Sequence, residues 1–197
     1  MKFITLLCDL EHKKIVLASQ SPRRIELLRS VGLEFEIYPP RIEEKSLPGF
    51  SPEDHVCHVA SEKAHWVAKH VNYDMIIAAD TIVTLDGHIF EKPSGHRQAE
   101  QMLKELSDRT HDVITGFCLL TPEEKVIDYE KTRVTFYKLS DSEIEMYLNS
   151  DEPFDKAGAY GIQGFASLFI RQLEGCYFNV VGFPLGKFYQ HLKKLDI

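Results

Sequence analysis

Val16–Gly32 reads VLASQSPRRIELLRSVG, and this stretch predicts how the fold begins. The apolar run from residue 15 to residue 18 is consistent with a buried strand. Pro22 suits the first position of a helix, and Gly32 suits its end. Apolar residues recur between these two with helical spacing, at Ile25, Leu27, Leu28 and Val31. The stretch therefore predicts a strand, a short loop and a helix.

The predicted loop combines two hydroxyl side chains, Ser19 and Ser21, with two arginines, Arg23 and Arg24. A strand–loop–helix junction leaves backbone N–H groups at the helix start, and the helix dipole adds positive potential there. Arginine guanidinium groups match phosphate oxygens. The combination favours a phosphate site, and the alternative is a surface helix with an ordinary cap and two solvated arginines. The loop is not a P-loop, because no GxxxxGK[ST] is present and GFPLGK at 182–187 has the wrong spacing.

The rest of the chain alternates between helical and strand patterns without repeats or a linker. We expect further strands at 35–38, 75–79, 82–85, 88–90, in two long runs within 111–139, and at 167–172. We expect further helices after Ser51, over 97–108, after the capping box of Ser140 and Glu143, and after Pro184. Residues 175–182 read as a loop. These elements predict one α/β domain over residues 1–197, with a mixed twisted sheet and helices on its faces.

The composition limits the classes of partner. A chain of 197 residues with 44% hydrophobic and 27% charged residues is typical of a globular domain. Its net charge of −7 argues against binding to a nucleic acid polymer or an anionic membrane. The four cysteines are scattered without a CxxC pair, which favours reduced thiols and a cytoplasmic location. The N-terminal MKFITLLCD faintly resembles a lipoprotein signal, but its apolar run is too short.

Two acidic positions are candidates for metal binding or proton transfer. Asp80 follows the apolar run 75–79, and ligands gather where the strands of an open α/β sheet end. A carboxylate there can bind a divalent cation or accept a proton from water; the alternative is a turn aspartate. Thr81 is placed to contact a substrate or to begin the next strand. Glu43 and Glu44 are adjacent acids with the same potential for metal binding, although acids on the surface are far commoner.

Lysines supply further positive charge. Lys63 falls in the middle of the apolar face of the helix after Ser51, so it either reaches past that face or points into a polar site. Lys92 follows Glu91 just after the predicted hairpin, and it could meet phosphate. Four polar residues on the Lys63 helix have spacing that could hold a metal, but a solvated face is favoured: His55, His58, Glu62 and His65.

A glycine-rich segment, DKAGAYGIQG at 155–164, contains too many small residues for a packed element. Glycine allows a backbone to approach a ligand closely. Gln163 carries both a donor and an acceptor, which suits recognition of the edge of a base. The alternative is an ordinary loop rich in turns.

Together these segments resemble the Maf family of nucleoside triphosphate pyrophosphatases. The matching stretches run from about residue 15 to residue 184: LASQSPRRIELL, SEKA, AADTIV, EKP, the spaced pattern ML..LS...H.V.TG, and DKAGAYGIQG. The resemblance implies a cytoplasmic enzyme that hydrolyses a nucleoside triphosphate to the monophosphate and pyrophosphate with a divalent cation, Mg²⁺ or Mn²⁺. It also implies two lobes around a cleft and a fold similar to the inosine triphosphate pyrophosphatases, in a family whose members are often homodimers.

The resemblance assigns roles to individual residues. Asp80 matches the proton acceptor, and the positions linked to substrate choice are Arg23, Thr81 and Gln163. Other matched residues line the family's cleft. Four of them are expected to bind phosphate: Ser19, Arg24, Lys63 and Lys92. The fifth, Glu44, is expected to bind the metal together with Asp80. The family often has an acid where Arg41 stands, and residues 1–12 extend beyond its usual start with no role.

The sequence leaves the substrate open. The Gly-Ile-Gln-Gly sequence at 161–164 resembles the branch of the family that acts on dTTP and UTP. Modified pyrimidine nucleotides are also candidate substrates. One alternative is the branch that acts on 7-methyl-GTP, which usually carries a different segment there. A second alternative is a nucleotide-binding regulator of cell division without turnover.

Overall fold

The structure, a computed structural model, describes residues 2–42, 49–150 and 152–195. The chain forms two compact units. Unit 1 comprises Met1–Asp80, Thr115–Glu130 and Gly182–Ile197, and unit 2 comprises Thr81–Ile114 and Lys131–Val181. Each unit is described by itself below.

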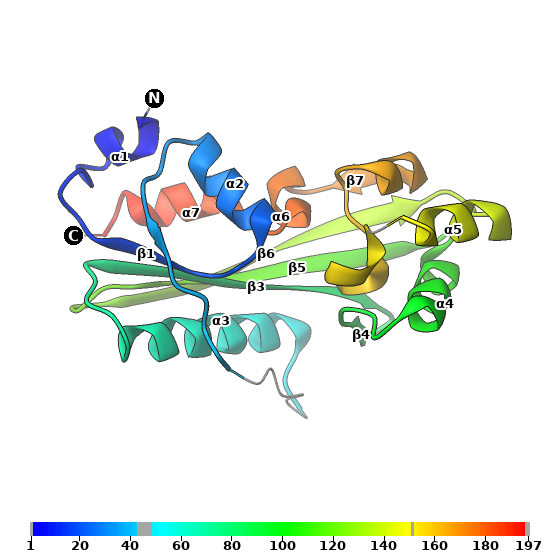
Figure 1. The fold of residues 1–197 in the computed structure, drawn as a ribbon, viewed down its shortest axis with the longest axis horizontal. Helices are drawn as coiled ribbons and strands as arrows, with labels where there is room; N and C mark the ends of the chain where they lie inside the picture. The colour runs from blue at the N-terminus through cyan, green and yellow to red at the C-terminus, as the bar shows by residue number, and fades with distance from the viewer. Residues whose placement is uncertain (1, 43–48, 151, 196–197) are drawn as a thin grey trace. The chain divides into compact units, whose positions relative to one another are not determined.

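The helices and strands follow one another along the chain, and Figure 1 labels most of them. The strands are β1 (Ile15–Ala18), β2 (Glu36–Ile37), β3 (Met75–Leu85), β4 (His88–Phe90), β5 (Thr110–Leu120), β6 (Lys125–Phe136) and β7 (Ile170–Glu174). The α-helices are α1 (Phe3–Leu7), α2 (Pro22–Ser30), α3 (Pro52–Ala68), α4 (His96–Leu106), α5 (Asp141–Leu148), α6 (Tyr177–Val181) and α7 (Leu185–Leu192). Three 3₁₀ helices are η1 (Pro153–Asp155), η2 (Ala157–Ala159) and η3 (Phe165–Phe169).

The sheet confirms the mixed α/β prediction. Its strands lie in the order β2-β1-β3-β5-β6-β7, and β4 pairs with β3. β1 runs parallel to both β2 and β3, whereas the β3–β4 and β6–β7 pairs are antiparallel. The hairpin between β3 and β4 has the predicted type I′ character, because Asp86 and Gly87 both have positive φ, at 52° and 79°.

In unit 1, helices cover both faces of the sheet (Figure 1). Alternate residues of three strands share a core with the apolar face predicted for α3: Val16, Ala18, Ile76, Ala78, Cys118 and Leu120 from the strands, with Ala60, Ala64 and Val67 from α3. Phe117 points to the opposite face, where its ring contacts Phe183, and Phe183 contacts Phe188 of α7. Unit 1 is therefore a sheet between α3 on one side and α2 and α7 on the other.

Unit 2 has a core of its own. The predicted apolar stripe of α4, formed by Ala99, Met102, Leu103 and Leu106, packs against residues of β3, β5, β6 and α5. Three aromatic side chains, Phe136, Tyr160 and Phe169, belong to the same core. Unit 2 therefore buries part of the glycine-rich segment, at Ala159 and Tyr160, among its apolar residues.

Four local predictions were wrong. Asp80 does not end a strand, because β3 continues without a break from Met75 to Leu85. The strand expected at 35–38 pairs for only two residues, since Pro39 and Pro40 follow it. The strand expected at 167–172 begins only at Ile170, because residues 165–169 form a 3₁₀ helix. Gly164, at φ 83°, turns the chain there, and its carbonyl accepts hydrogen bonds from Ser167. The loop expected at 175–182 contains α6.

The N-terminal extension packs on the end of α2. Ile4 N–H donates to the carbonyl of Val31, and Thr5 Oγ1 donates to the carbonyl of Gly32 at 2.9 Å. Ile4 and Leu10 are buried. Residues 2–12 are thus part of unit 1, although the sequence assigned them no role. Within the described part of the chain, every helix is too short or too polar to cross a bilayer.

Candidate active site

The loop between β1 and α2 is held by a small hydrogen-bond network. Ser21 caps α2 as its N-cap residue, with Pro22 at the first helical position as predicted. The hydroxyl of Ser19 accepts from the N–H of Ser21 at 3.2 Å and from Nη1 of Arg24 at 2.8 Å. Nε of Arg24 donates to the carbonyl of Gly182 at 3.1 Å. These bonds fix the shape of the loop at the positive end of the α2 dipole.

Arg24 therefore has a structural task in this loop. Only 8% of the residue is exposed, and two of its nitrogen atoms are used within the protein. Gly182 belongs to the GFPLGK stretch, and the sequence of that stretch did not predict its contact with Arg24. Arg23 is partly exposed on the first turn of the same helix. Of the two arginines, Arg23 is the one with side-chain surface open to solvent.

Asp80 and Lys63 form a buried ion pair. Lys63 Nζ lies 2.7 Å from Oδ1 of Asp80, and the two side chains are 12% and 11% exposed. A carboxylate in the interior of a strand is costly without a compensating charge, and Lys63 supplies that charge. The pair explains both why a lysine lies on the apolar face of α3 and why β3 continues through Asp80.

The strand register brings the Ser19 loop close to Asp80 along the sheet. β1 and β3 are parallel, with Ala18 opposite Ala78. Ser19 is the first residue after β1, and Asp80 stands two residues beyond Ala78. The loop therefore begins beside the part of β3 that carries Asp80, in unit 1.

The position of α3 is set by its close approach to β5. Ser51 is the predicted N-cap and Pro52 the first helical residue. A Cβ atom at Gly116 would lie 2.6 Å from the backbone carbon of Val56 and 2.7 Å from the nitrogen of Cys57. Glycine thus allows the α3 backbone to rest directly on β5, which fixes the helix that carries Lys63.

The described residues contain no group of three or more His, Cys, Asp or Glu side chains that could hold a metal ion by themselves. The four polar residues of α3 do not form such a site. The predicted solvated face is exposed at Glu62 and His65, whereas His55 is buried. Glu43 and Glu44 lie outside the described residues. Asp80 fits a divalent cation in another way, because Mg²⁺ in nucleotide sites is commonly held by one or two carboxylates together with substrate phosphates.

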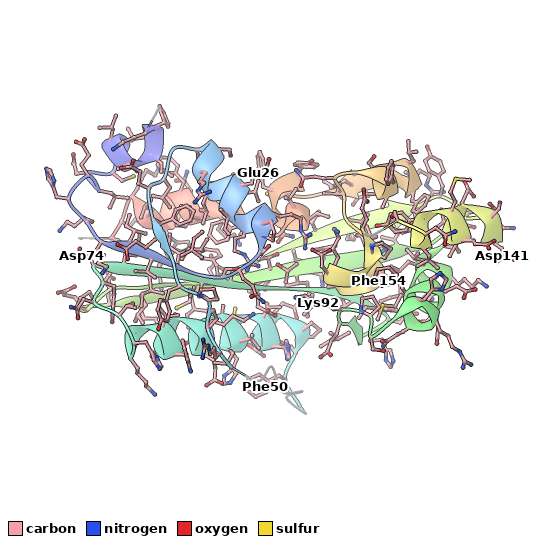
Figure 2. The ribbon with its side chains drawn as sticks, in the orientation of Figure 1. Glu26, Phe50, Asp74, Lys92, Asp141 and Phe154 are labelled. Carbon is pink, nitrogen blue, oxygen red and sulfur yellow. The ribbon has the colours of Figure 1, made fainter. Side chains whose placement is uncertain are left out.

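The remaining predicted site residues belong to unit 2. Thr81 is half-buried in β3, next to Asp80 in the chain. Lys92 is exposed just after β4, where Figure 2 labels it. Gln163 is exposed in the glycine-rich segment. Lys156 Nζ pairs with Asp155 at 2.6 Å.

Two contacts of the glycine-rich segment were not predicted. Tyr160 forms a hydrogen bond with His111, with 2.6 Å between Oη and Nε2, and burial lowers the pKa of His111 to about 3. Glu152, before the segment, accepts a hydrogen bond from the N–H of Phe165, the residue directly after it, at 3.2 Å to each carboxylate oxygen. The sequence marked His111 only as part of the spaced pattern ML..LS...H.V.TG. That pattern did not indicate that His111 would bond to Tyr160.

Comparisons with known proteins agree with this architecture. Residues 14–195 match the model of the family described as "Maf-like protein". A dTTP/UTP pyrophosphatase of Bacillus cereus is 45% identical over 94% of this chain and 97% of its own. One of Caldicellulosiruptor saccharolyticus is 45% identical over 93% and 95%. The Staphylococcus aureus Ham1 protein, 14% identical, has the same fold, with a TM-score of 0.54 over 92% of this chain and 99% of that one. This chain belongs to the Maf-like protein family.

Proposed function

We propose that the protein hydrolyses dTTP and UTP to the nucleoside monophosphate and pyrophosphate. The observation that carries this proposal is the placement of Asp80, a buried carboxylate paired with Lys63 at 2.7 Å beside the Ser19 loop. The names of relatives that are 45% identical over nearly the whole chain support the same reaction. The Gly-Ile-Gln-Gly form at 161–164 supports pyrimidine nucleotides.

The triphosphate binds at the loop between β1 and α2. The α2 N-terminus presents the positive end of its dipole, and Arg23 adds a guanidinium on the first turn. Arg24 and Ser19 act by holding the loop in shape, as their mutual hydrogen bond supports. Lys92, which is exposed just after β4, adds positive charge for phosphate binding.

In the reaction, water attacks the α-phosphorus in line with the bond to the leaving pyrophosphate. The new P–O bond forms as the bond from the α-phosphorus to the bridging oxygen breaks, and the electron pair leaves with pyrophosphate. Asp80 accepts the proton of the attacking water or holds a cation, and Lys63 holds the Asp80 carboxylate in place. Positioning and charge neutralisation supply most of the rate in such reactions.

A divalent cation, Mg²⁺ or Mn²⁺, would be held by Asp80 and Glu44 together with phosphate oxygens. When bound, it supplies charge neutralisation on the phosphates. Gln163 recognises the base, because its side chain is exposed and offers both a donor and an acceptor. Thr81, next to Asp80 in β3, contributes to the same choice of substrate.

The broader setting is also a proposal. The chain works as one Maf-like domain with a short N-terminal extension, in the cytoplasm, either alone or as a homodimer. The four cysteines are all free, which supports a reducing compartment. Light scattering on the purified protein measures the oligomeric state.

A pyrophosphate-release assay tests the function. The panel contains dTTP, UTP, CTP, GTP and 7-methyl-GTP, each with Mg²⁺ or Mn²⁺, and the Asp80→Asn variant serves as the blank. A preference for dTTP and UTP supports the proposal. A preference for 7-methyl-GTP contradicts the choice of branch, and binding of nucleotides without release of pyrophosphate supports the regulator.

A further inference from the structure

His111 and Tyr160 form a buried pair in unit 2. His111 lies on β5 and is 2% exposed, and Tyr160 is 4% exposed within the glycine-rich segment. Nε2 and Oη lie 2.6 Å apart. Phe136 packs against both rings, with centroids 5.0 Å from that of His111 and 4.7 Å from that of Tyr160. The hydrogen bond therefore sits in an apolar environment that excludes competing water.

This bond is the main polar interaction of the His111 ring. Nδ1 of His111 is buried and makes no hydrogen bond within the described part of the chain. Burial lowers the pKa of His111 to about 3, so the imidazole is neutral at physiological pH. Loss of the Tyr160 hydroxyl would leave a second buried nitrogen without a partner, and that desolvation is costly. The segment is thus tied to β5 at Tyr160.

A second interaction holds the end of the segment, at Phe165. Both carboxylate oxygens of Glu152 accept from the N–H of Phe165 at 3.2 Å. Gly164 has φ 83°, and a Cβ there would lie 2.3 Å from Oε1 of Glu152. Glu152 therefore occupies the space beside Gly164 and fixes the turn that leads into η3.

Gln163 lies between these two ties. The intervening backbone contains Gly161, whose α-carbon is so close to Lys156 that a Cβ would lie 2.9 Å from that side chain. Glycine-rich backbone loses much conformational freedom when it is ordered. Holding it at both ends before the substrate binds lowers the entropic cost of presenting one side chain to a ligand.

We propose that His111 and Glu152 are positioning residues, which hold the segment from Tyr160 to Phe165 so that Gln163 faces the base. The inference rests on the proposed function in one respect, because it takes Gln163 to read the base. Neither residue touches the reacting atoms. Each sets selectivity among nucleotides through the backbone that carries Gln163.

The variants that test this are Tyr160→Phe, His111→Gln and Glu152→Gln, with Gln163→Ala for comparison. Tyr160→Phe removes one hydroxyl and keeps the ring, so it is the variant most certain to fold. The matched controls are Tyr137→Phe and Glu145→Gln, which make the same changes at exposed positions of unit 2. Melting temperature is recorded for each variant.

Two measurements are made on each variant. The first is hydrogen exchange of the peptide spanning 157–165 in the protein without nucleotide. The second is the ratio of kcat/KM for UTP to that for GTP. We expect faster exchange in the three positioning variants and a fall in the ratio of about tenfold, which corresponds to the loss of about one net hydrogen bond. The two controls should match the wild type in both.

The outcomes separate the inference from the proposed function. If Gln163→Ala lowers the ratio but the positioning variants leave both the ratio and the exchange unchanged, the inference is overturned and base reading stands. If Gln163→Ala leaves the ratio unchanged, base reading by Gln163 fails and the inference fails with it. A merely structural role for His111 and Glu152 would lower the melting temperature and reduce kcat/KM equally for both nucleotides, which also overturns the inference.

Discussion

Lys63 Nζ lies 2.7 Å from Oδ1 of Asp80, and both side chains are largely buried. The lysine comes from α3 and the aspartate from β3, so the pair joins a helix to the sheet beneath it. Because each charge compensates the other in a site with little water, neither can be removed without consequence for its partner. The first two predictions follow from this pair.

Replacing Asp80 with asparagine keeps the shape of the side chain and removes its charge. We expect kcat for UTP to fall at least about 100-fold, the usual contribution of a positioned acid or base. The dissociation constant of UTP, measured calorimetrically, should change little. Asp108→Asn, at an exposed position, is the control and should retain full activity. Near-normal turnover of Asp80→Asn would disprove the role given to this carboxylate.

Replacing Lys63 with methionine leaves a buried carboxylate without its partner. We expect the free energy of unfolding to fall by about 3 kcal/mol in urea titrations. Adding Asp80→Asn to the same protein should recover part of that loss, because the orphaned charge is then gone. Lys69→Met, at the exposed end of α3, is the control. If the losses of Lys63→Met and Asp80→Asn simply add up in the double variant, the pair does not couple.

The two adjacent arginines should behave differently. Arg24→Lys cannot make both the bond to Gly182 and the bond to Ser19, so we expect a loss of stability of about 1 to 2 kcal/mol. Arg23→Lys should leave the melting temperature unchanged and raise KM for UTP. Calorimetry and steady-state kinetics on the two variants check this. A raised KM with normal stability in Arg24→Lys would instead favour direct contact with phosphate.

His111 predicts a specific loss of stability in acid. Its pKa is lowered to about 3 in the folded protein, whereas the unfolded chain titrates near 6.5. The unfolded state therefore binds a proton first, so stability is complete above about pH 6.5 and declines as pH falls toward 3. Between pH 7 and pH 5 the wild type should lose about 2 kcal/mol more than His111→Gln. Urea titrations at the two pH values measure the difference, and equal losses would contradict it.

Gly116 should not tolerate a side chain. A methyl group there would lie 2.6 Å from the backbone of α3, which cannot move aside as a flexible side chain can. We expect Gly116→Ala to cost about 1 to 3 kcal/mol and to reduce activity by shifting the helix that carries Lys63. Gly186→Ala is the control, because nothing lies within 4 Å of its Cβ position, and helix α7 should gain stability there. Thermal unfolding of both variants provides the comparison.

Much of the local structure could be predicted from the sequence. Ser21 and Pro22 mark the start of α2, Ser140 and Glu143 form their capping box, and Asp86-Gly87 makes the hairpin turn. These signals depend on residues that are neighbours in the chain, so periodicity and cap chemistry suffice. The sequence alone also placed Lys63 on the apolar face of its helix, although it did not identify Asp80 as the partner.

The partners of the site residues could not be predicted in the same way. Arg24 bonds to a carbonyl 158 residues away, and His111 bonds to Tyr160 across 49 residues. Such contacts depend on the order of strands in the sheet, which no local pattern encodes. The same limit explains the error at Asp80: a charged residue inside a strand reads as a strand end unless the lysine that compensates it is known to lie above it.

The chain passes between the two units four times, after residues 80, 114, 130 and 181. The first three passages occur inside β3, β5 and β6, and the fourth immediately precedes Gly182, whose carbonyl holds Arg24. In genetic terms, neither unit corresponds to a continuous stretch of coding sequence. A single exchange of a continuous coding segment therefore cannot replace the unit with the carboxylate while keeping the unit with the glycine-rich segment.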